Sequence, residues 1–310
     1  MIKIENIIKE YNTKDKSKIR VLNNINLTIK DGEMIALLGA NGSGKSTLLK
    51  CICGVLGLTS GSIRVDGKDA FKNRKYLIKN MGVIFNQKPS FIIDLSVRDN
   101  LNFFQAIYEI LQEKFDANID FIDQYLKFKD LLEKPYRKLS FGERVKCEIV
   151  SILLHDPQYI YMDEPTIGLD YNAKKGLYEL IAELKKQGRT IIIITHEVDY
   201  IEGVCDKVVI LKNGVITYEG NPKKVTDRVN EKQRIVVKYN SVINNDNVKN
   251  VQLRSSVIKD EEREIQFVVQ KNEDIGRLIA NIASAYDIES LNMERISIRE
   301  VLEDAIKEDI

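Results

Sequence analysis

A glycine-rich loop that ends in lysine and serine is the segment of this chain best suited to bind phosphate. Its sequence from residue 39 to residue 46, GANGSGKS, matches G-x-x-x-x-G-K-[S/T], with an apolar run before it and a predicted helix after it. Glycines let backbone N–H groups turn inward around phosphate oxygens, and the start of the helix adds a positive dipole end. The candidate phosphate-binding residues are Gly39, Asn41, Gly42, Ser43, Gly44, Lys45, Ser46 and Thr47.

The lysine and the two hydroxyl groups that close this loop have different expected tasks. Lys45 supplies a mobile positive charge to the phosphate oxygens, Ser46 offers the hydroxyl that ligates Mg²⁺, and Thr47 is a further phosphate donor. The order strand, loop, helix separates this segment from a chance glycine-rich turn. The loop therefore predicts a nucleotide phosphate site.

Two adjacent carboxylates, Asp163 and Glu164, follow the apolar run YIYM at residues 159–162. Ligands of parallel α/β sheets bind at the carboxyl ends of the strands, so both groups are expected at a ligand site. Asp163 is the expected Mg²⁺ residue, and Glu164 the expected base that polarises the attacking water. Alone, Asp-Glu-Pro is equally typical of a solvated strand exit. Combined with the phosphate loop, it indicates nucleotide hydrolysis.

The elements that must position these motifs alternate between apolar strands and helices. Predicted strands lie at 35–39, 82–85, 159–164, 190–195 and 207–211, and predicted helices begin at 46 and run through 177–186. This alternation is typical of a mostly parallel α/β layer. Hairpin-like segments near both ends of this region predict an antiparallel β portion joined to the layer.

A helical insertion is expected at about residues 96–155. The stretch from 96 to 134 carries no strand signal, and apolar residues recur at helical spacing. These are Leu101, Phe104, Ile107, Tyr108 and Leu111. We assign the first domain, with this insertion, to residues 1–220.

A second domain is expected at residues 221–310, where the sequence first becomes polar and then alternates between strand and helix patterns. Strands are predicted at 234–239 and 264–270, and helices at 275–286 and 297–307. The segment holds no catalytic cluster. We expect a small α+β accessory domain that aids dimerisation or regulation.

The overall composition is that of an ordinary globular protein, with 310 residues, 44% hydrophobic and 30% charged. Lys and Arg number 47 and Asp and Glu 46, so no broad basic field exists to attract nucleic acid. No apolar run reaches the roughly 18 residues of a membrane helix, and the N-terminus lacks the apolar core of a signal peptide. We expect a cytoplasmic protein with four free cysteines and no disulfide.

Five further elements make the chain resemble the ATP-binding subunits of ABC transporters, a branch of the P-loop NTPases. Leu139 to Glu143, LSFGE, resembles the signature usually written LSGGQ. Gly168 to Asp170 resembles the D-loop, and His196 the switch histidine. Gln87 resembles the Q-loop glutamine, and Tyr11 the aromatic residue that stacks on adenine. These elements cover about residues 1–220.

This resemblance implies an ATPase that works as a homodimer, in which each ATP lies between one phosphate loop and the partner copy's signature. It assigns Glu164, His196 and Gln87 to catalysis, Ser46, Gln87 and Asp163 to Mg²⁺, and Asp170 to the D-loop. The signature residues Ser140, Phe141, Gly142 and Glu143 would act in trans. Phe141 departs from the family glycine, and Glu143 from the family glutamine.

Since the chain contains no spanning segment, the resemblance also implies a separate transmembrane subunit and a place on the inner face of the cell membrane. Phe91, Phe103 and Phe104 lie where the family's membrane subunit docks, although each is equally suited to core packing. The segments GVIFNQKPSFIIDLSVRDNL and DEPTIGLD resemble the ABC-2 exporter branch.

Two alternatives remain from the sequence. One is a soluble ABC-type ATPase that regulates a non-transport partner, although the separation of Lys45 from Ser140 is too short for the long coiled-coil arm of chromosome-acting relatives. The other is a nucleotide sensor without turnover, against which Glu164 and His196 argue.

Overall fold

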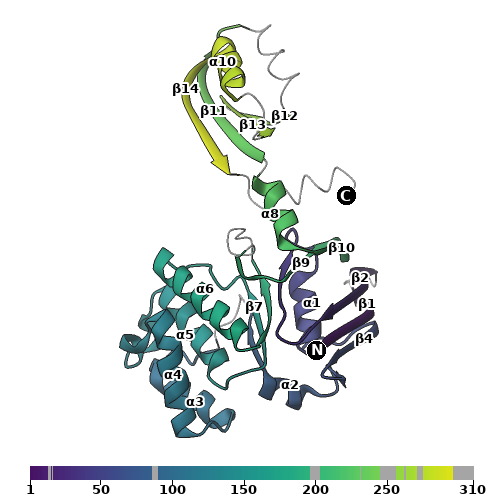
Figure 1. Cartoon of the computed structure of the whole chain (residues 1–310), viewed down its shortest axis with the longest axis vertical. Coiled ribbons are helices and arrows are strands. Elements are labelled where there is room, and N and C mark those ends of the chain that lie inside the picture. Colours follow the sequence, from purple (N-terminus) through teal and green to yellow (C-terminus); the bar gives the residue numbers. More distant parts are fainter. Residues whose placement is uncertain are drawn as a thin grey trace. The chain divides into compact units, whose positions relative to one another are not determined.

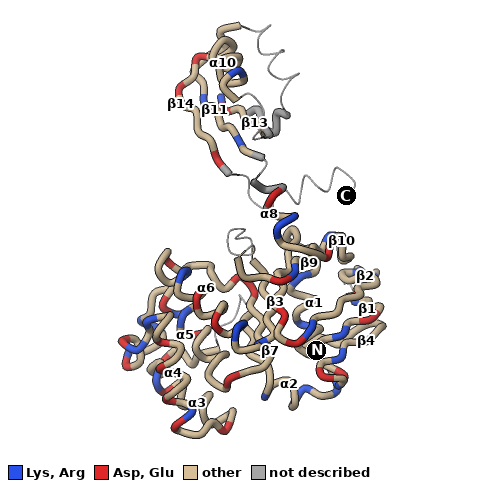
Figure 2. Tube along the Cα trace, in the orientation of Figure 1, with Lys and Arg blue, Asp and Glu red and all other residues tan. Residues whose placement is uncertain are grey.

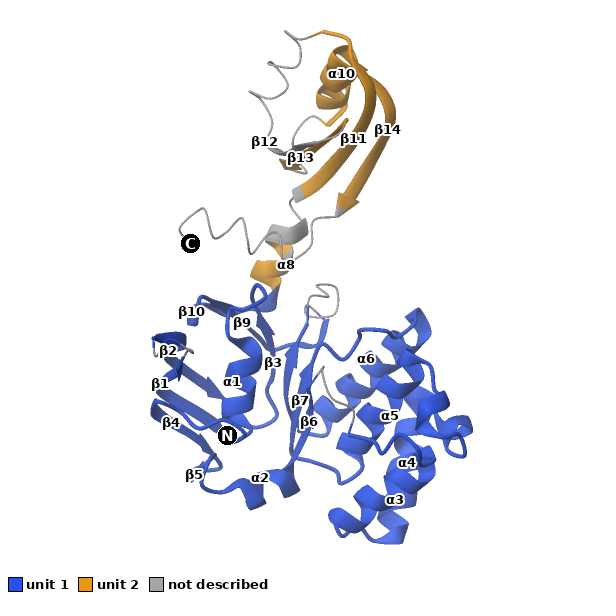
Figure 3. Cartoon of the chain, turned by 180° about the vertical axis from the view of Figure 1, so that it is seen from behind, with its two compact units in different colours: residues 1–222 blue, residues 223–310 orange. Residues whose placement is uncertain are grey.

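The computed structural model describes residues 1–12, 15, 17–85, 90–195, 203–230, 232–244, 256–261, 263–270 and 275–295. The chain forms two compact units, residues 1–222 and residues 223–310 (Figure 3). Basic and acidic residues are interspersed along the traces of both units (Figure 2). Within the described parts of the chain, no helix is both long enough and apolar enough to cross a membrane.

The first unit contains a four-stranded antiparallel sheet and a six-stranded sheet. The first has the order β2-β1-β4-β5 and comprises β1 (Ile2–Asn12), β2 (Lys18–Ile29), β4 (Ser60–Val65) and β5 (Lys68–Asp69). The second has the order β10-β9-β3-β8-β7-β6 and comprises β3 (Met34–Leu38), β6 (Met81–Ile84), β7 (Tyr159–Asp163), β8 (Thr190–Ile194), β9 (Lys207–Lys212) and β10 (Val215–Gly220).

Five strands of the six-stranded sheet are parallel, and β10 joins the edge as an antiparallel hairpin with β9. Every residue of β3 and β8 is buried, because helices or the other sheet cover both faces. The mixed α/β class with an antiparallel portion, predicted from the apolar runs, is confirmed.

Helices surround the six-stranded sheet and link its strands. They are α1 (Lys45–Ile52), α2 (Arg74–Asn80), α3 (Val97–Ile107), α4 (Gln112–Leu126), α5 (Phe141–Leu153) and α6 (Tyr171–Lys186), with 3₁₀ turns η1 (Lys129–Leu131) and η2 (Tyr136–Lys138). Figure 1 shows α1 between the two sheets. Its side chains Leu48, Leu49 and Ile52 belong to one buried cluster with residues of both sheets. This packing fixes the start of α1 next to the ends of β3 and β7.

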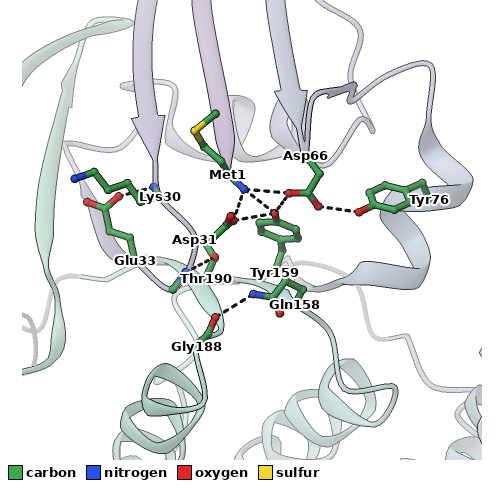
Figure 4. A network of polar contacts seen from close by, with 11 residues as sticks. Met1, Lys30, Asp31, Glu33, Asp66, Tyr76, Gln158, Tyr159, Gly188 and Thr190 are labelled. Carbon is green, nitrogen blue, oxygen red and sulfur yellow. Dashed lines mark hydrogen bonds and ion pairs between the residues drawn. The ribbon is translucent and has the colours of Figure 1, made fainter.

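A polar network joins the two sheets at the amino end of β7, where Tyr159 lies (Figure 4). The Tyr159 hydroxyl donates to Asp66, and the Tyr76 hydroxyl donates to the other carboxylate oxygen of Asp66 at 2.7 Å. The Met1 ammonium group lies 3.0 Å from the Asp66 carboxylate and also contacts Asp31. Burial and the neighbouring Asp66 charge raise the pKa of Tyr159, so its hydroxyl stays a donor.

The apolar positions predicted at helical spacing from Leu101 to Leu111 do not all lie on one helix. Helix α3 ends at Ile107, and the chain turns at Glu109, whose φ is 56°. Leu111 then precedes α4 and is 78% exposed. Of the other four apolar positions, Leu101 is fully buried, Phe104 and Tyr108 are half-buried, and Ile107 is exposed.

His155 follows α5 and packs against the insertion. Its ring stacks on Tyr108 with centroids 4.0 Å apart, and its Nε2 lies 3.1 Å from the Met81 carbonyl oxygen. Burial lowers the pKa of His155 to about 4, because the charged imidazolium would lose its hydration. His155 is thus a neutral packing residue at neutral pH.

The second unit contains a four-stranded antiparallel sheet with one helix packed on it. The elements are α8 (Pro222–Asn230, which begins at the unit boundary), β11 (Lys232–Val242), β12 (Ser256–Glu261), β13 (Glu264–Gln270), α10 (Ile275–Ala285) and β14 (Tyr286–Arg295), and the sheet order is β12-β13-β11-β14. Ile282 and Ala285 of α10 pack on Val237 and Phe267 in a separate core. The predicted helix at 297–307 lies outside the described residues.

Candidate nucleotide site

The glycine-rich loop connects β3 to α1, and its first glycine cannot be replaced without moving the loop. Gly39 has a φ of 146°, and a Cβ there would lie 2.1 Å from the backbone oxygen of Leu211 in β9. Gly44, with a φ of 106°, precedes the first residue of α1. Asn41 and Gly42 are exposed at the turn. The loop therefore passes close to β9 and leaves its central residues open to a ligand.

Lys45 curls back over this loop. Its side chain is buried, and its Nζ donates to the carbonyl oxygens of Gly39 at 2.6 Å and Ala40 at 3.0 Å. The buried Ser43 hydroxyl oxygen makes no hydrogen bond within the described parts of the chain. A donor without a partner, beside an ammonium group and a helix start, is a polar environment that fits phosphate oxygens.

Ser46 and Asp163 are in direct contact, although they come from different elements. The Ser46 hydroxyl, in the first turn of α1, donates to Oδ2 of Asp163 at 2.9 Å. Burial raises the pKa of Asp163, while the Ser46 hydrogen bond and the Lys45 charge oppose that change. A hydroxyl and a carboxylate at this distance form an oxygen donor pair of the type that Mg²⁺ prefers. Thr47, next along α1, is half-buried.

Glu164 follows Asp163 with an unusual backbone conformation. Its φ is 52°, in the left-handed region that side chains seldom adopt, and its N–H donates to the Ile194 carbonyl oxygen at 2.9 Å. Such a conformation costs about 1 kcal/mol or more, and it persists where the surrounding structure fixes it. Here the end of β8 fixes it, so the Glu164 side chain emerges at the carboxyl end of the sheet.

Ser140 and Glu143 form a reciprocal cap at the start of α5. The Ser140 hydroxyl accepts from the Glu143 N–H at 3.3 Å, and the Glu143 carboxylate accepts from the Ser140 N–H at 2.8 Å. The Ser140 hydrogen bonds and nearby Lys134 lower the pKa of Glu143. Glutamate thus does here what glutamine does in a capping box. The spacing S-x-x-E could have revealed this role from the sequence, where Glu143 was only noted as a departure.

Phe141 packs on the D-loop of its own chain. A Cβ at Gly168, where φ is 82°, would lie 2.1 Å from Cδ1 of the Phe141 ring, and a Cβ at Gly142 would lie 2.6 Å from the Gly168 carbonyl oxygen. The signature and the D-loop are therefore in van der Waals contact. Phe141 remains 58% exposed, so it presents part of its ring on the surface.

Asp170 caps the following helix. Its carboxylate accepts a hydrogen bond from the Ala173 N–H at 2.8 Å at the start of α6. This cap fixes the exit of the D-loop just as Ser140 fixes the entry of α5. Both helix starts lie next to the Phe141–Gly168 contact.

Of the three remaining predicted site residues, Tyr11, Gln87 and His196, only Tyr11 lies in the described part of the chain. Tyr11 lies near the end of β1, is 38% exposed, and has the Lys9 ammonium 5.1 Å from its ring centroid. Gln87 and His196 lie outside the described residues. Around the loop, the structure brings together Lys45, Ser46 and Asp163, followed by Glu164.

The aromatic residues of the insertion have different environments. Phe91 is buried and stacks on Tyr136 with centroids 4.8 Å apart, while Phe104 is half-buried against Phe91. Phe103 is 48% exposed. Of these three residues, only Phe103 is about half exposed, and Phe91 has a packing role.

Comparisons with known proteins show the family of this chain. The family described as "ABC transporter" matches residues 22–167. The chain is 31% identical over 207 residues to the ABC transporter ATP-binding protein NatA of Bacillus subtilis, covering 66% of this chain and 84% of that protein. It is 33% identical over 229 residues to the energy-coupling factor transporter ATP-binding protein EcfA3 of Clostridium perfringens, covering 73% and 79%.

A solved structure shares the fold of the first unit. The dimeric structure of MJ0796, a bacterial ABC transporter cassette, superposes with a TM-score of 0.65 at 25% identity. The match covers 72% of this chain and 99% of that one.

Proposed function

Since the chain belongs to the ATP-binding subunits of ABC transporters and is an ATPase, we propose that its glycine-rich loop, Asp163 and Glu164 form the hydrolytic centre. The observation that carries this proposal is the 2.9 Å contact between the Ser46 hydroxyl and Asp163. It joins the phosphate loop to the strand end that bears Glu164. A hydrolytic centre needs the phosphate-binding and acidic groups at one place.

Each residue then has a distinct task. Lys45 exchanges its carbonyl partners for phosphate oxygens, and the loop N–H groups hold the same oxygens. Ser46 and Asp163 would hold Mg²⁺, which, when bound, supplies charge neutralisation to the phosphates. Glu164 accepts the proton of the attacking water. Gln87 and His196 complete the catalytic set, and Tyr11 stacks on the adenine ring.

We also propose that two copies of the chain close around ATP. The start of α5, with Ser140, Phe141, Gly142 and Glu143, would face the partner copy's phosphate loop. Support comes from the dimeric bacterial cassette that shares this fold, and from the positive dipole end of the helix start. Residues 221–310 would aid dimerisation or regulation.

The hydrolytic assignment is tested with Glu164→Gln, which keeps the shape of the side chain and removes its basicity. We expect kcat to fall by about 10²-fold or more, because a positioned general base contributes about 10²–10⁴-fold. Binding of a fluorescent ATP analogue should persist, since the loop is unchanged. A wild-type rate no higher than that of the variant would refute the assignment.

Coupling to transport requires a membrane partner, which we propose to be a separate permease of the ABC-2 exporter type, with this chain peripheral on the inner face of the membrane. The support is the resemblance of residues 82–101 and 163–170 to that branch. A second candidate is an energy-coupling factor assembly, which the name of EcfA3 suggests. Purification of the tagged chain from native membranes, followed by identification of the co-purified subunit, distinguishes the two. A chain recovered without any membrane subunit would favour a non-transport ATPase.

A further inference from the structure

The carboxylate of Glu148, in α5, joins three segments of the first unit. The Ser90 N–H donates to Oε1 at 3.0 Å and to Oε2 at 3.2 Å, and the Ser90 hydroxyl donates to Oε2. The Tyr136 hydroxyl donates to Oε1 at 2.9 Å. One carboxylate on α5 thus accepts hydrogen bonds from a loop residue and from a residue of a 3₁₀ turn.

These residues lie next to two parts of the candidate site, the segment of Gln87 and the signature. Ser90 is the first described residue after Gln87, and Tyr136 lies in η2, just before the signature. Glu148 lies about two turns along the helix that Ser140 caps. The carboxylate therefore connects the segment that follows Gln87 with the signature helix.

Aromatic and cationic packing reinforces this connection. Tyr136 and Phe91 are almost fully buried and stack with centroids 4.8 Å apart. Arg144, one turn before Glu148, places its guanidinium 5.4 Å from the Tyr136 ring and donates to the Arg137 carbonyl oxygen at 2.8 Å. These groups form a packed unit that includes Glu148.

The electrostatics favour a carboxylate at this position. Burial, and then the Glu148 charge, raise the pKa of Tyr136, so its hydroxyl remains a donor at all ordinary pH values. Hydrogen bonds to an ionised acceptor are roughly twice as strong as neutral ones. A neutral side chain would hold Ser90 and Tyr136 less firmly, and a side chain without an oxygen would not hold them at all.

We propose that Glu148 is a positioning residue that makes the segment after Gln87 and the signature helix move as one body during the ATPase cycle. The proposal deepens the proposed function and rests on it. The hydrogen bonds described for the Glu148 carboxylate go to Ser90 and Tyr136, which lie outside the phosphate loop. Its effect would therefore fall on turnover and leave ATP binding by the loop unchanged.

The kinetic test compares Glu148→Ala, Glu148→Gln and Glu133→Ala. Glu133 is the matched control, because its carboxylate also accepts a hydrogen bond, at 2.6 Å, but from Arg98 of α3 and not from Ser90 or Tyr136. We expect Glu148→Ala to lower kcat about tenfold, equivalent to about 1.4 kcal/mol, with KM for ATP within about twofold. Glu148→Gln should lose less, since its amide oxygen still accepts. An unchanged kcat, or a rise in KM that accounts for the loss, overturns the proposal.

A second variant guards against simple unfolding. Tyr136→Phe removes one hydroxyl and keeps the stacked ring, so the fold should persist while kcat falls in the same direction by a smaller factor. If Tyr136→Phe hydrolyses ATP at the wild-type rate while Glu148→Ala is unfolded, the proposed linkage is wrong.

Hydrogen exchange gives a readout that does not depend on hydrolysis. In the Glu164→Gln background, ATPγS with Mg²⁺ should slow exchange in both the Ser90 segment and the start of α5. Adding Glu148→Ala should leave protection in only one of the two. If both segments respond as before, the linkage is refuted. If instead wild type shows no ATPase above Glu164→Gln, the proposed function fails while this exchange test still decides the linkage.

Discussion

The contact between Phe141 and Gly168 yields a quantitative prediction for Gly168→Ala. An alanine at a φ of 82° costs about 1–2 kcal/mol, because the left-handed conformation crowds the Cβ. The new Cβ would lie 2.1 Å from the Phe141 ring, so the ring must swing into solvent. The ring is 58% exposed, so the swing exposes about 80 Å² more and costs about 2 kcal/mol. Gly168→Ala should therefore cost about 3–4 kcal/mol in total.

A double-mutant cycle separates these two contributions. Phe141→Ala alone should lower the free energy of unfolding by about 2 kcal/mol, because the ring packing is lost. Gly168→Ala already loses the same packing, so the double variant loses it only once. The double variant should be about as stable as Gly168→Ala, which is about 2 kcal/mol better than the sum of the single effects. Gly188→Ala is the matched control, since Gly188 also has a φ of 82° but has nothing within 4 Å of its Cβ position. It should cost only the conformational part and add independently to Phe141→Ala.

The assay is urea unfolding followed by circular dichroism and tyrosine fluorescence, as the chain contains no tryptophan. Because the chain has two compact units, hydrogen exchange of peptides around 139–170 assigns the transition to the first unit. Additive effects of Phe141→Ala and Gly168→Ala would refute the reasoning, because they would mean that the ring does not pack on Gly168.

Three further predictions concern other residues. His155 has a pKa of about 4 in the folded chain and about 6.5 in the unfolded chain, so the unfolded chain binds its proton first as the pH falls. The free energy of unfolding should therefore fall by up to about 3 kcal/mol between pH 6.5 and pH 4. His155→Phe should flatten that part of a plot of urea midpoint against pH. Parallel plots for wild type and His155→Phe would contradict this role of His155. Glu143→Gln should keep the cap with Ser140, whereas Glu143→Ala should lower the free energy of unfolding by about 1 kcal/mol; equal urea midpoints for both would contradict the capping role. Gly39→Ala should abolish binding of a fluorescent ATP analogue, because its Cβ would overlap the Leu211 backbone; wild-type affinity in a titration would show that the loop tolerates the change.

The sequence predicted the sheet well because its central strands are buried on both faces. The runs at Met34–Leu38, Tyr159–Asp163 and Thr190–Ile194 are continuous and apolar, which is the pattern of parallel strands. The sequence-based prediction missed elements that bury fewer side chains. Helix α8 was missed within a polar stretch, and the half-exposed β14, YDIESLNMER, has no clear alternation.

For the candidate site, spacing indicated which residues belong together but not how side chains turn. Loop and strand-end positions suffice to bring Ser46 near Asp163, because both follow from the βα order. Whether Phe141 faces a partner or its own D-loop depends on a side-chain rotation, which the sequence pattern does not encode. The same holds for Glu148, whose partners Tyr136 and Ser90 lie 12 and 58 residues away in the sequence.

The ammonium group of Lys45 has consequences for which ligands the loop accepts. Because it already bonds to the carbonyl oxygens of Gly39 and Ala40, an incoming anion enters by exchange and must compete with the loop's own backbone. A ligand without negatively charged oxygens, such as adenosine, cannot replace these carbonyl oxygens as acceptors, so the Lys45 hydrogen bonds would stay as they are. With the proposed function, the loop would discriminate among ligands by the negative charge they carry, before any group acts on the bond to be broken.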